Sequence, residues 1–370
     1  MKVAIVHEML VKLGGAENVV LDILEMFPEA DLFTLIYDEE KVGRVFPISR
    51  IKQIPSITQR IYKWTHRQRL CLPFLSRAVE SLDLSEYDLV IASSSGFAHG
   101  CITKPETLFM VYYHSPARYL WDWTNEYKRD IGFGSGIKKV LLNKFMLKAR
   151  LWDYLAGQRH DVAIAASKQV VSRISKYYRR ESEVIYPAVW VEDFEIGEKV
   201  LKDREYYVIT SALTEFKKVE LSIKAFNTLG YQLKIIGAGN QLDYLKSIAE
   251  PNIEFLGHKN HNEIRDIYLD ARGFIMSGRD DFGIAPIEAM AAGIPVFALR
   301  EGGLVETNVE GLSGEFFDKA DGSDFIGKFN LFHNNISENK YDRIKIRNHA
   351  MKFNKARFIT ELKETIEKYI

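Results

Sequence analysis

Residues 280–296, DDFGIAPIEAMAAGIPV, carry the clearest structural signal in the chain. Asp280 follows a short apolar run that is typical of a strand, and Gly283 provides a turn from which a helix begins. Glu288 falls inside this helix, whose small residues allow close packing against the next apolar run, starting at Pro295. This order of strand, turn, helix and strand is the repeating unit of a parallel β-sheet.

The same alternation extends outward from this stretch over almost the whole chain. Short runs rich in β-branched residues alternate with segments of helical periodicity, as expected for βαβ units. Two series of strands are separated by Pro187–Arg204, which is acid-rich and has no clear periodicity. The expected strands are Val3–His7, Leu32–Tyr37, Leu89–Ser93, Leu108–His114, Val162–Ala166, Glu183–Tyr186, Tyr207–Ser211, Gln232–Ile236, Ile253–Leu256, Gly273–Met276 and Pro295–Leu299.

Two serial sets of βαβ units predict an α/β protein with two Rossmann-like domains facing across a cleft. We expect an N-terminal domain over residues 1–188, a C-terminal domain over 189–353, and a C-terminal helix over 354–370 that packs back on the N-terminal domain. A length of 370 residues agrees, because a single core rarely grows to that size. Ligands bind beyond the carboxyl ends of strands in such sheets, so residues that follow strands are the candidate site residues.

The composition, 46% hydrophobic and 27% charged, is that of a globular protein. Cys71 and Cys101 have no metal-binding or redox spacing, which fits a reducing cytosol. The first residues, MKVAIVHEML, indicate a buried strand rather than a secretory signal. Because no apolar run reaches the roughly 18 residues of a membrane-spanning helix, we expect a cytoplasmic protein.

Positive charge is concentrated in the first half of the chain. Residues 1–188 carry 26 Lys and Arg against 21 Asp and Glu, whereas the remainder carries 24 against 29. Two stretches, Arg50–Val79 and Ile131–Trp152, contain several cations and no acidic residue. Their interleaved apolar residues predict amphipathic helices that lie on an anionic membrane surface, peripheral to the inner face of the membrane. The alternative is a pair of solvated helices packed on the sheet.

Candidate donor-binding residues follow the first strand. Gly14 and Gly15 precede a helix that starts near Asn18, so backbone N–H groups at its N-terminus are available to a phosphate or a sugar hydroxyl. The spacing is not the dinucleotide fingerprint, which disfavours NAD and FAD. A plain tight turn is the alternative.

Further candidates end two other strands of the first half. His114 and Arg118 follow the strand that starts at Leu108, where the histidine either touches a ligand or packs in the core. Ser94 and Ser95 lie in a Ser-Ser-Ser-Gly turn, which either binds an acceptor or only closes a loop.

In the second half, Lys217 and Lys218 open a helix. Cations at a helix N-terminus oppose the macrodipole, and a bound diphosphate would reverse that balance. Phe282, Gly283 and Ile284 begin a second helix of this kind. Its N-terminus suits a phosphate or a sugar, while the nearby carboxylates of Asp280 and Glu288 suit sugar and ribose hydroxyls. Helix capping by these carboxylates is the alternative.

Taken together, several of these segments resemble the retaining family 4 glycosyltransferases of the GT-B fold. Within that family, the sequence is most similar to bacterial mannosyltransferases of O-antigen and exopolysaccharide synthesis. The segments that carry the resemblance are Gly14–Glu17, Tyr87–Ile91, His114–Tyr119, Val184–Pro187 and Asp281–Met290.

The resemblance implies specific roles for these residues. The family binds its donor without a metal, and no D-x-D triplet occurs in this sequence. His114 matches the histidine that contacts the donor sugar, and Gly15 matches the turn near the diphosphate. Glu288 matches the ribose-binding carboxylate, and Asp280 stands where the family usually has a Glu at the transferred sugar.

The phosphate-binding segment departs from the family pattern. With Lys217 aligned, Ala212 stands where the family has an arginine, so half of the charge clamp is absent. Lys218, Arg279 and Arg300 are nearby cations that can substitute.

The resemblance implies a retaining glycosyltransferase that moves a hexose, mannose, from a nucleotide-sugar to a lipid-linked saccharide in surface polysaccharide synthesis. GDP-mannose is the implied donor, and a polyprenyl-diphosphate-linked saccharide is the implied acceptor. The alternatives are a non-catalytic homologue that acts as a sugar-binding or partner scaffold, and an epimerase or phosphorylase of the same fold. Nothing in the sequence indicates a nucleic-acid partner.

Overall fold

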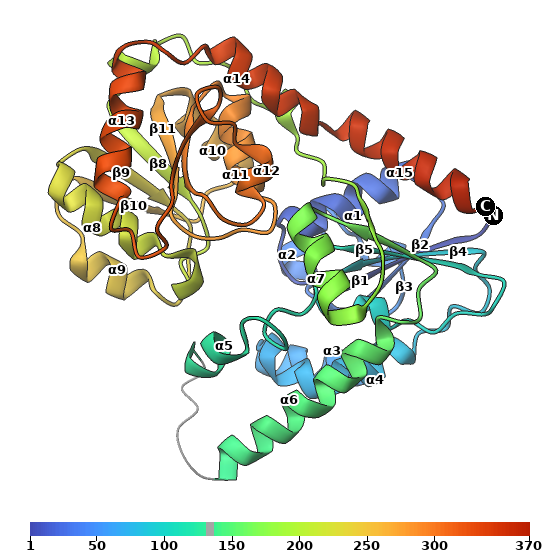
Figure 1. Ribbon diagram of the computed structural model, residues 1–370. Helices are drawn as coiled ribbons and strands as arrows, with labels where there is room; N and C mark the ends of the chain where they lie inside the picture. Colours follow the sequence, from blue (N-terminus) through green and yellow to red (C-terminus); the bar gives the residue numbers. More distant parts are fainter. Residues whose placement is uncertain (131–136) are drawn as a thin grey trace. The chain divides into compact units, whose positions relative to one another are not determined.

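The computed structural model describes residues 1–130 and 137–370, which form two compact units (Figure 1). Unit 1 comprises residues 1–187 and 358–370, and unit 2 comprises residues 188–357. Each unit contains one parallel sheet flanked by helices. The predicted α/β class with two Rossmann-like sheets is therefore confirmed.

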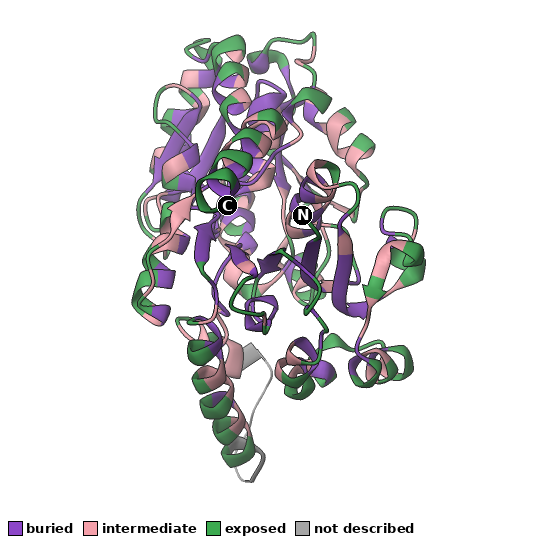
Figure 2. Cartoon of the chain, turned by 90° about the vertical axis from the view of Figure 1, so that its right-hand side faces the viewer, coloured by how far each residue is buried: buried purple, intermediate pink, exposed green. Residues whose placement is uncertain are grey.

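The sheet of unit 1 has seven strands. Its order is β3 (Ile51–Gln53), β2 (Asp31–Tyr37), β1 (Val3–Leu10), β4 (Leu89–Ser94), β5 (Leu108–Tyr113), β6 (Val162–Ala165) and β7 (Glu183–Val184). Its helices are α1 (Gly15–Met26), α2 (Glu39–Val42), α3 (Ser56–Thr65), α4 (Leu72–Glu80), α5 (Thr124–Asp130), α6 (Ile137–Ala156), α7 (Lys168–Tyr178) and most of α15 (Lys355–Tyr369). The central strands are buried along nearly their full length, as expected for a parallel sheet covered on both faces (Figure 2).

The sheet of unit 2 has six strands. Its order is β10 (Ile253–Gly257), β9 (Gln232–Ile236), β8 (Tyr206–Thr210), β11 (Ala271–Met276), β12 (Val296–Leu299) and β13 (Gly314–Phe317). Its helices are α8 (Val219–Leu229), α9 (Leu242–Ile248), α10 (His261–Leu269), α11 (Ile284–Ala291), α12 (Leu304–Thr307), α13 (Phe325–Ser337) and α14 (Arg343–Ala350).

Both sheets share one topology. The chain builds outward from the first strand in one direction, and then returns to build on its other side. The direction therefore reverses between β1 and β4 in unit 1, and between β8 and β11 in unit 2. Ligands of such sheets bind at this reversal, beyond the carboxyl ends of the two strands.

The sequence-based prediction missed two strands and overextended one. β3 is a three-residue strand with the polar sequence IKQ, and β13 begins with Gly and Glu, so neither has a strong apolar signal. The strand expected over Glu183–Tyr186 contains only Glu183 and Val184, because only those two residues pair with β6.

The segment expected to be a linker is packed on unit 2. Arg204 is only 2% exposed, and its guanidinium donates to the carbonyl of Ala271 at 2.8 Å. Arg343 donates to the carbonyl of Lys199 at 3.0 Å. The C-terminal helix α15 packs in unit 1, where the ring of Phe358 lies 5.8 Å from that of Tyr112.

The second acid-free stretch, Ile131–Trp152, lies partly outside the described residues, as do the side chains of Lys138 and Lys139. Its described part falls within α6. Among the residues that the structure covers, no helix is long and apolar enough to cross a membrane.

Candidate functional site

The loop after β1 presents a helix N-terminus at the reversal point of unit 1. Gly14 is the N-cap of α1, no side chain caps this end, and the helix begins at Gly15. A Cβ atom at Gly14 would lie 3.1 Å from the Glu17 carboxylate, so a side chain would crowd the turn. Because no side chain caps this end, the first N–H groups of α1 are available to donate to a bound anion such as a phosphate.

His114 is held by a chain of buried polar groups. Its Nε2 lies 2.8 Å from Ser93 Oγ, and the same Oγ lies 3.1 Å from Nδ1 of His7. Nε2 of His7 lies 3.8 Å from the Glu17 carboxylate. These residues come from the ends of β1, β4 and β5 and from α1, so the fold assembles the chain from four elements.

The single proton of Ser93 couples the two histidines. When His7 is neutral with its proton on Nε2 towards Glu17, its Nδ1 accepts the Ser93 hydroxyl. Ser93 Oγ then accepts from Nε2–H of His114, which leaves Nδ1 of His114 as an acceptor. When His7 is doubly protonated, both hydrogen bonds reverse direction: Nδ1–H of His7 donates to Ser93 Oγ, and the Ser93 hydroxyl donates to Nε2 of His114. The proton of neutral His114 is then on Nδ1, which becomes a donor.

The burial of this chain has electrostatic consequences. Burial and, to a smaller extent, the charge of the neighbouring His7 lower the pKa of His114 to about 3, so His114 is neutral at physiological pH. Burial opposes the ionisation of Glu17, but hydrogen bonding and charge from His7 hold the pKa of Glu17 below its usual range. A neutral imidazole beside a carboxylate suits a hydrogen bond to a sugar hydroxyl.

Ser94 and Ser95 shape a loop around Glu8. The Glu8 carboxylate accepts hydrogen bonds from the Ser94 hydroxyl at 3.0 Å and from the N–H of Ser95 at 2.9 Å. The N–H groups of residues 96–98 also donate to it. Ser94 is fully buried, which favours loop closure over acceptor binding for its hydroxyl, whereas Ser95 is exposed. Arg118 stacks on the Trp123 ring at 3.7 Å.

Unit 2 brings Lys217 and Asp280 together at its own reversal point. Nζ of Lys217 lies 2.7 Å from Oδ2 of Asp280. One hydrogen bond and one close approach of the backbone, at Gly278, hold this geometry. Ser277 Oγ donates to the carbonyl of Lys218 at 2.8 Å, and a Cβ at Gly278 would lie 2.3 Å from the Lys217 carbonyl oxygen.

The cations expected to replace the missing arginine have other partners. Nζ of Lys218 donates to the carbonyl of Ala320 at 2.8 Å. Arg300 pairs with Asp318 at 2.6 Å and with Glu310 at 2.9 Å. The expectation that Lys218 or Arg300 completes the clamp is therefore not supported, because both cations are already neutralised or directed elsewhere.

Two further positions bear on the clamp. Arg279 lies beside Asp280 in sequence, and its Nε is 4.0 Å from the Glu301 carboxylate, so it is the most loosely held of the three candidate cations. Ala212 is exposed. The next residue, Leu213, donates its N–H to the carbonyl of Ala238. The backbones of the two loops lie so close together that Gly237 and Gly239 leave no room for a side chain.

The N-terminus of α11 is also uncapped by any side chain. Gly283 is its N-cap with φ +92°, a conformation that favours glycine, and Ile284 begins the helix. Phe282 packs on Phe353 at 5.7 Å, so it orients this turn from the core side. Burial, with a smaller contribution from the charge of Asp193, raises the pKa of Glu288 to about 7.

Local sequence patterns assigned no individual role to His7, Glu8 or Glu17, and they linked Ser93 only to a turn that binds an acceptor or closes a loop. A usable signal exists, since His7 and Ser93 end neighbouring strands and pair in register, and parallel strands bring such ends together. Among residues 1–130 and 137–370, no group of three His, Cys, Asp or Glu side chains could hold a metal ion.

Two Rossmann-like units with this shared topology define the class of GT-B proteins. The structure of HepE from Anabaena in complex with UDP superposes with a TM-score of 0.72 at 15% identity, covering 100% of both chains. The sucrose-phosphate synthase of Thermosynechococcus elongatus superposes with a TM-score of 0.73 at 13% identity, covering 100% of this chain and 99% of that one. At such identities the likeness shows the fold.

Residues 191–350, which lie within unit 2, match the family described as Glycosyl transferases group 1. An uncharacterized glycosyltransferase of Methanocaldococcus jannaschii is 26% identical over 53% of this chain and 56% of its own length. An alpha-1,3/1,6-mannosyltransferase of Kluyveromyces lactis is 24% identical over 84% of this chain and 71% of its own length. The chain thus spans little more than half of the first of these relatives.

Proposed function

We propose that the chain is a retaining glycosyltransferase that moves a hexose, mannose, from a nucleotide-sugar to a lipid-linked saccharide. The observation that carries this proposal is that each unit gathers candidate donor-binding residues at the reversal point of its sheet, where ligands of such sheets bind. The match of residues 191–350 to the family described as Glycosyl transferases group 1 supports the same proposal. The relatives that are mannosyltransferases motivate the sugar, with GDP-mannose as the donor.

In this proposal each candidate residue has a defined role. The N-termini of α1 and α11 and the Lys217 ammonium stabilise the negative charge that develops on the leaving diphosphate. His114 and Asp280 bind hydroxyls of the transferred sugar, and Glu288 binds the ribose. The bond between the sugar and the diphosphate breaks, the acceptor oxygen bonds to the same carbon, and the acceptor proton passes to a phosphate oxygen of the leaving group.

A single-turnover assay tests the proposal. GDP-mannose and a panel of other nucleotide-sugars are mixed with a polyprenyl-diphosphate-linked saccharide, and release of the nucleoside diphosphate is measured together with sugar transfer. We expect transfer at a rate that depends on both substrates. Binding of nucleotide-sugars without transfer to any acceptor would overturn it.

A non-catalytic sugar-binding homologue is the second candidate. Two observations favour it, since Ala212 is where a clamp arginine is expected and the Lys217 ammonium is already paired with Asp280. This candidate predicts that thermal stability rises with a nucleotide-sugar, by mass action, while no product forms.

A further inference from the structure

Unit 1 contains a groove of about 980 Å³ between two sets of helices. One wall comes from the end of α3, the turn at Gln68–Cys71 and the start of α4. The other wall comes from α5 and α6, with Leu141, Leu142 and Phe145 among its side chains. We call this the α3–α6 groove. Its lining is mostly apolar, so it offers a hydrocarbon chain a place out of water.

The rim of the α3–α6 groove is cationic. Lys41, Arg67 and Arg69 line it, and no carboxylate is among its described lining residues. Lys41 is fixed in place, because its ammonium pairs with Asp38 at 2.8 Å and donates to the Tyr62 hydroxyl at 3.1 Å. Arg67 and Arg69 are exposed, and the Arg69 guanidinium lies 6.0 Å from the centre of the Tyr127 ring. This arrangement complements a ligand with an apolar body and an anionic head.

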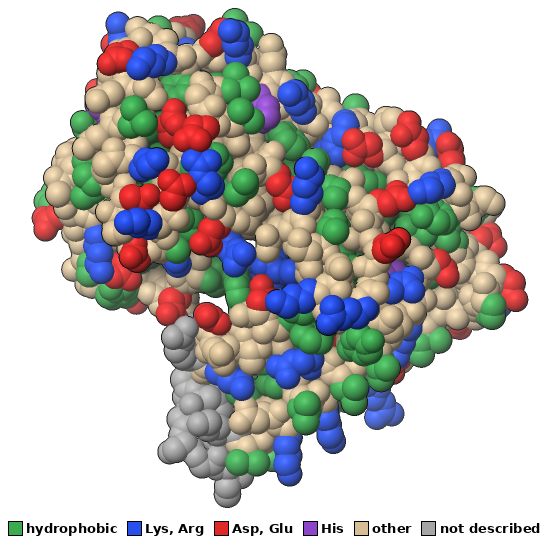
Figure 3. All heavy atoms as spheres, viewed as in Figure 1, with side chains coloured by type: hydrophobic (Ala, Val, Ile, Leu, Met, Phe, Trp, Pro, Cys, Tyr) green, Lys and Arg blue, Asp and Glu red, His purple; other side chains and the backbone are tan. Residues whose placement is uncertain are grey.

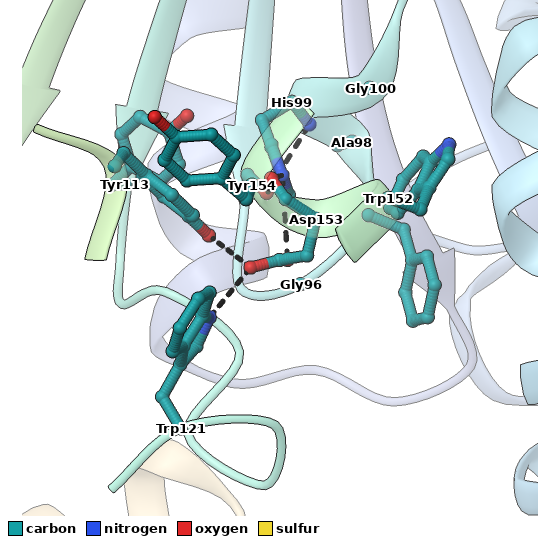
Figure 4. Close-up of polar contacts among 12 residues, drawn as sticks. Gly96, Ala98, His99, Gly100, Tyr113, Trp121, Trp152, Asp153 and Tyr154 are labelled. Carbon is teal, nitrogen blue, oxygen red and sulfur yellow. Dashed lines mark hydrogen bonds and ion pairs between the residues drawn. The ribbon is translucent and has the colours of Figure 1, made fainter. Parts of the chain in front are cut away.

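The α6 wall is held in place from behind. Ala117, Leu120 and Met146 form a small buried core under it. Arg150 Nε donates to the carbonyl of Leu120 at 2.7 Å. Trp121 Nε1 donates to the Asp153 carboxylate at 2.7 Å, as Figure 4 shows. The groove is therefore preformed, which lowers the entropic cost of binding.

One residue of the groove lining lies beside the loop that follows β4. Tyr119 lines the groove five residues after His114. The loop after β4 is adjacent, since a Cβ at Gly96 would lie 3.8 Å from the Tyr119 hydroxyl. A ligand in the groove can thus extend its head towards the candidate sugar site of this unit.

The surface around the groove suits the same class of ligand. Exposed apolar side chains continue beyond it on both sets of helices, with Trp64 87% exposed and Leu147 65% exposed. Figure 3 shows Lys, Arg and hydrophobic side chains along the region of α6 with few acidic ones between them. Such a surface favours contact with an anionic lipid layer, from which an amphiphile could enter the groove.

We propose that the α3–α6 groove binds the prenyl chain and adjoining phosphate of a prenyl-phosphate-linked acceptor. The chain lies between the apolar walls, and Arg67 and Arg69 pair with the phosphate. This inference rests on the proposed function, because it names the part of the acceptor that the protein holds. An acidic amphipathic protein segment fits less well, since it would not bring a hydroxyl to His114.

The test measures binding of farnesyl phosphate to the full chain by calorimetry, without any donor. We expect farnesyl phosphate to bind, and we expect farnesol and inorganic phosphate each to bind at least 10-fold more weakly than farnesyl phosphate. Leu141→Glu, at a position 61% exposed in the apolar wall, is expected to weaken farnesyl phosphate binding at least 10-fold. Leu147→Glu is the matched control, since it places the same charge on the same helix outside the groove. Arg67→Gln is expected to weaken binding, with Arg60→Gln on α3 as its control.

Equal binding by Leu141→Glu and the unchanged protein, or equal losses in variant and control, would overturn the proposal. So would binding to anionic vesicles with no binding of farnesyl phosphate, which would indicate a membrane or protein contact face instead. All variants should keep the same unfolding midpoint and nucleotide-sugar binding. Farnesyl phosphate binding without sugar transfer would overturn the proposed function alone, and transfer to lipid-linked acceptor that is unaffected by Leu141→Glu would overturn the groove alone.

Discussion

The ammonium of Lys217 lies 2.7 Å from the carboxylate of Asp280, so the cation expected to hold the donor diphosphate is paired before any donor binds. The pair is only partly exposed, with side-chain exposures of 12% and 29%. A diphosphate that binds to Lys217 must therefore compete with Asp280 or displace it.

Asp280→Asn is expected to tighten binding of a nucleoside diphosphate by about 3- to 10-fold, because it removes the competing charge. It should also lower the transfer rate if Asp280 holds a sugar hydroxyl. Lys217→Gln is expected to weaken the same binding, and Lys224→Gln, an exposed lysine on α8, serves as the control. Calorimetric titration with nucleoside diphosphate measures both effects. Weaker binding by Asp280→Asn than by the unchanged protein would contradict this account.

Ala212→Arg is expected to raise the transfer rate, by up to about 100-fold, if the diphosphate clamp is incomplete. The position is exposed in the loop after β8, so the longer side chain can be accommodated. Single-turnover kinetics measure the change. An unaltered rate would mean that another cation, with Arg279 the least constrained candidate, already fills this role.

Ser93→Ala is expected to lower kcat by about 10-fold while leaving the dissociation constant of the nucleoside diphosphate unchanged. The variant removes the hydroxyl that couples His114 to His7, so the tautomer of His114 is no longer fixed. Nitrogen NMR of the imidazoles provides a readout that a purely structural loss would not change. Glu17→Gln should shift the same signals, whereas Ser95→Ala, in the exposed part of the loop, should not.

The pH dependence of donor binding is expected to follow Glu288. With a pKa of about 7, this carboxyl is mostly protonated at pH 6 and mostly ionised at pH 8. If the carboxylate accepts ribose hydroxyls, nucleotide-sugar affinity should rise by up to about 10-fold over that range. A nucleotide-sugar is the right probe, because a terminal phosphate titrates near pH 6. Glu288→Gln should flatten the profile, and an unchanged profile in this variant would exclude Glu288 as its source.

Asp153 is expected to make stability fall as pH rises. Burial raises its pKa to about 7 from the usual 3.8, although hydrogen bonds from Trp121 and Tyr178 oppose the shift. The folded state therefore holds the proton more tightly, and this contribution to stability is complete below about pH 4 and lost as pH rises to 7.

Asp153→Asn removes this contribution. The unfolding free energy of the unchanged protein, relative to that of the variant, should thus fall by up to about 4 kcal/mol as pH rises from 4 to 7. Urea unfolding followed by tryptophan fluorescence reports mainly on unit 1, which holds four of the five tryptophans: Trp64, Trp121, Trp123 and Trp152. Glu106→Gln, at an exposed position of the same unit, should leave the pH profile unchanged.

The fold class could be predicted from local sequence patterns, because the period of apolar residues reflects which faces of strands and helices are buried. The strand Gln232–Ile236 was predicted with its observed bounds, and Asp280, Gly283 and Glu288 were placed correctly around a strand, a turn and a helix. The short edge strands β3 and β13 were not predicted, because an edge strand pairs on one side only and can form with few apolar residues.

The contacts between distant polar groups could not be predicted in this way. Lys217 and Asp280 are 63 residues apart in sequence, and Ser93 is 86 residues from His7, so no local pattern links them. Their contacts arise because parallel strands bring their carboxyl ends to one edge of a sheet at the point where the strand order reverses. Likewise, the charge runs in the sequence indicated amphipathic helices, but the groove between α3 and α6 exists only because packing places the two helices around a shared apolar space. The period of apolar residues is a local property of the chain and predicts helices and strands. A binding site brings together residues that are distant in sequence, and only the packing of those helices and strands places them in contact.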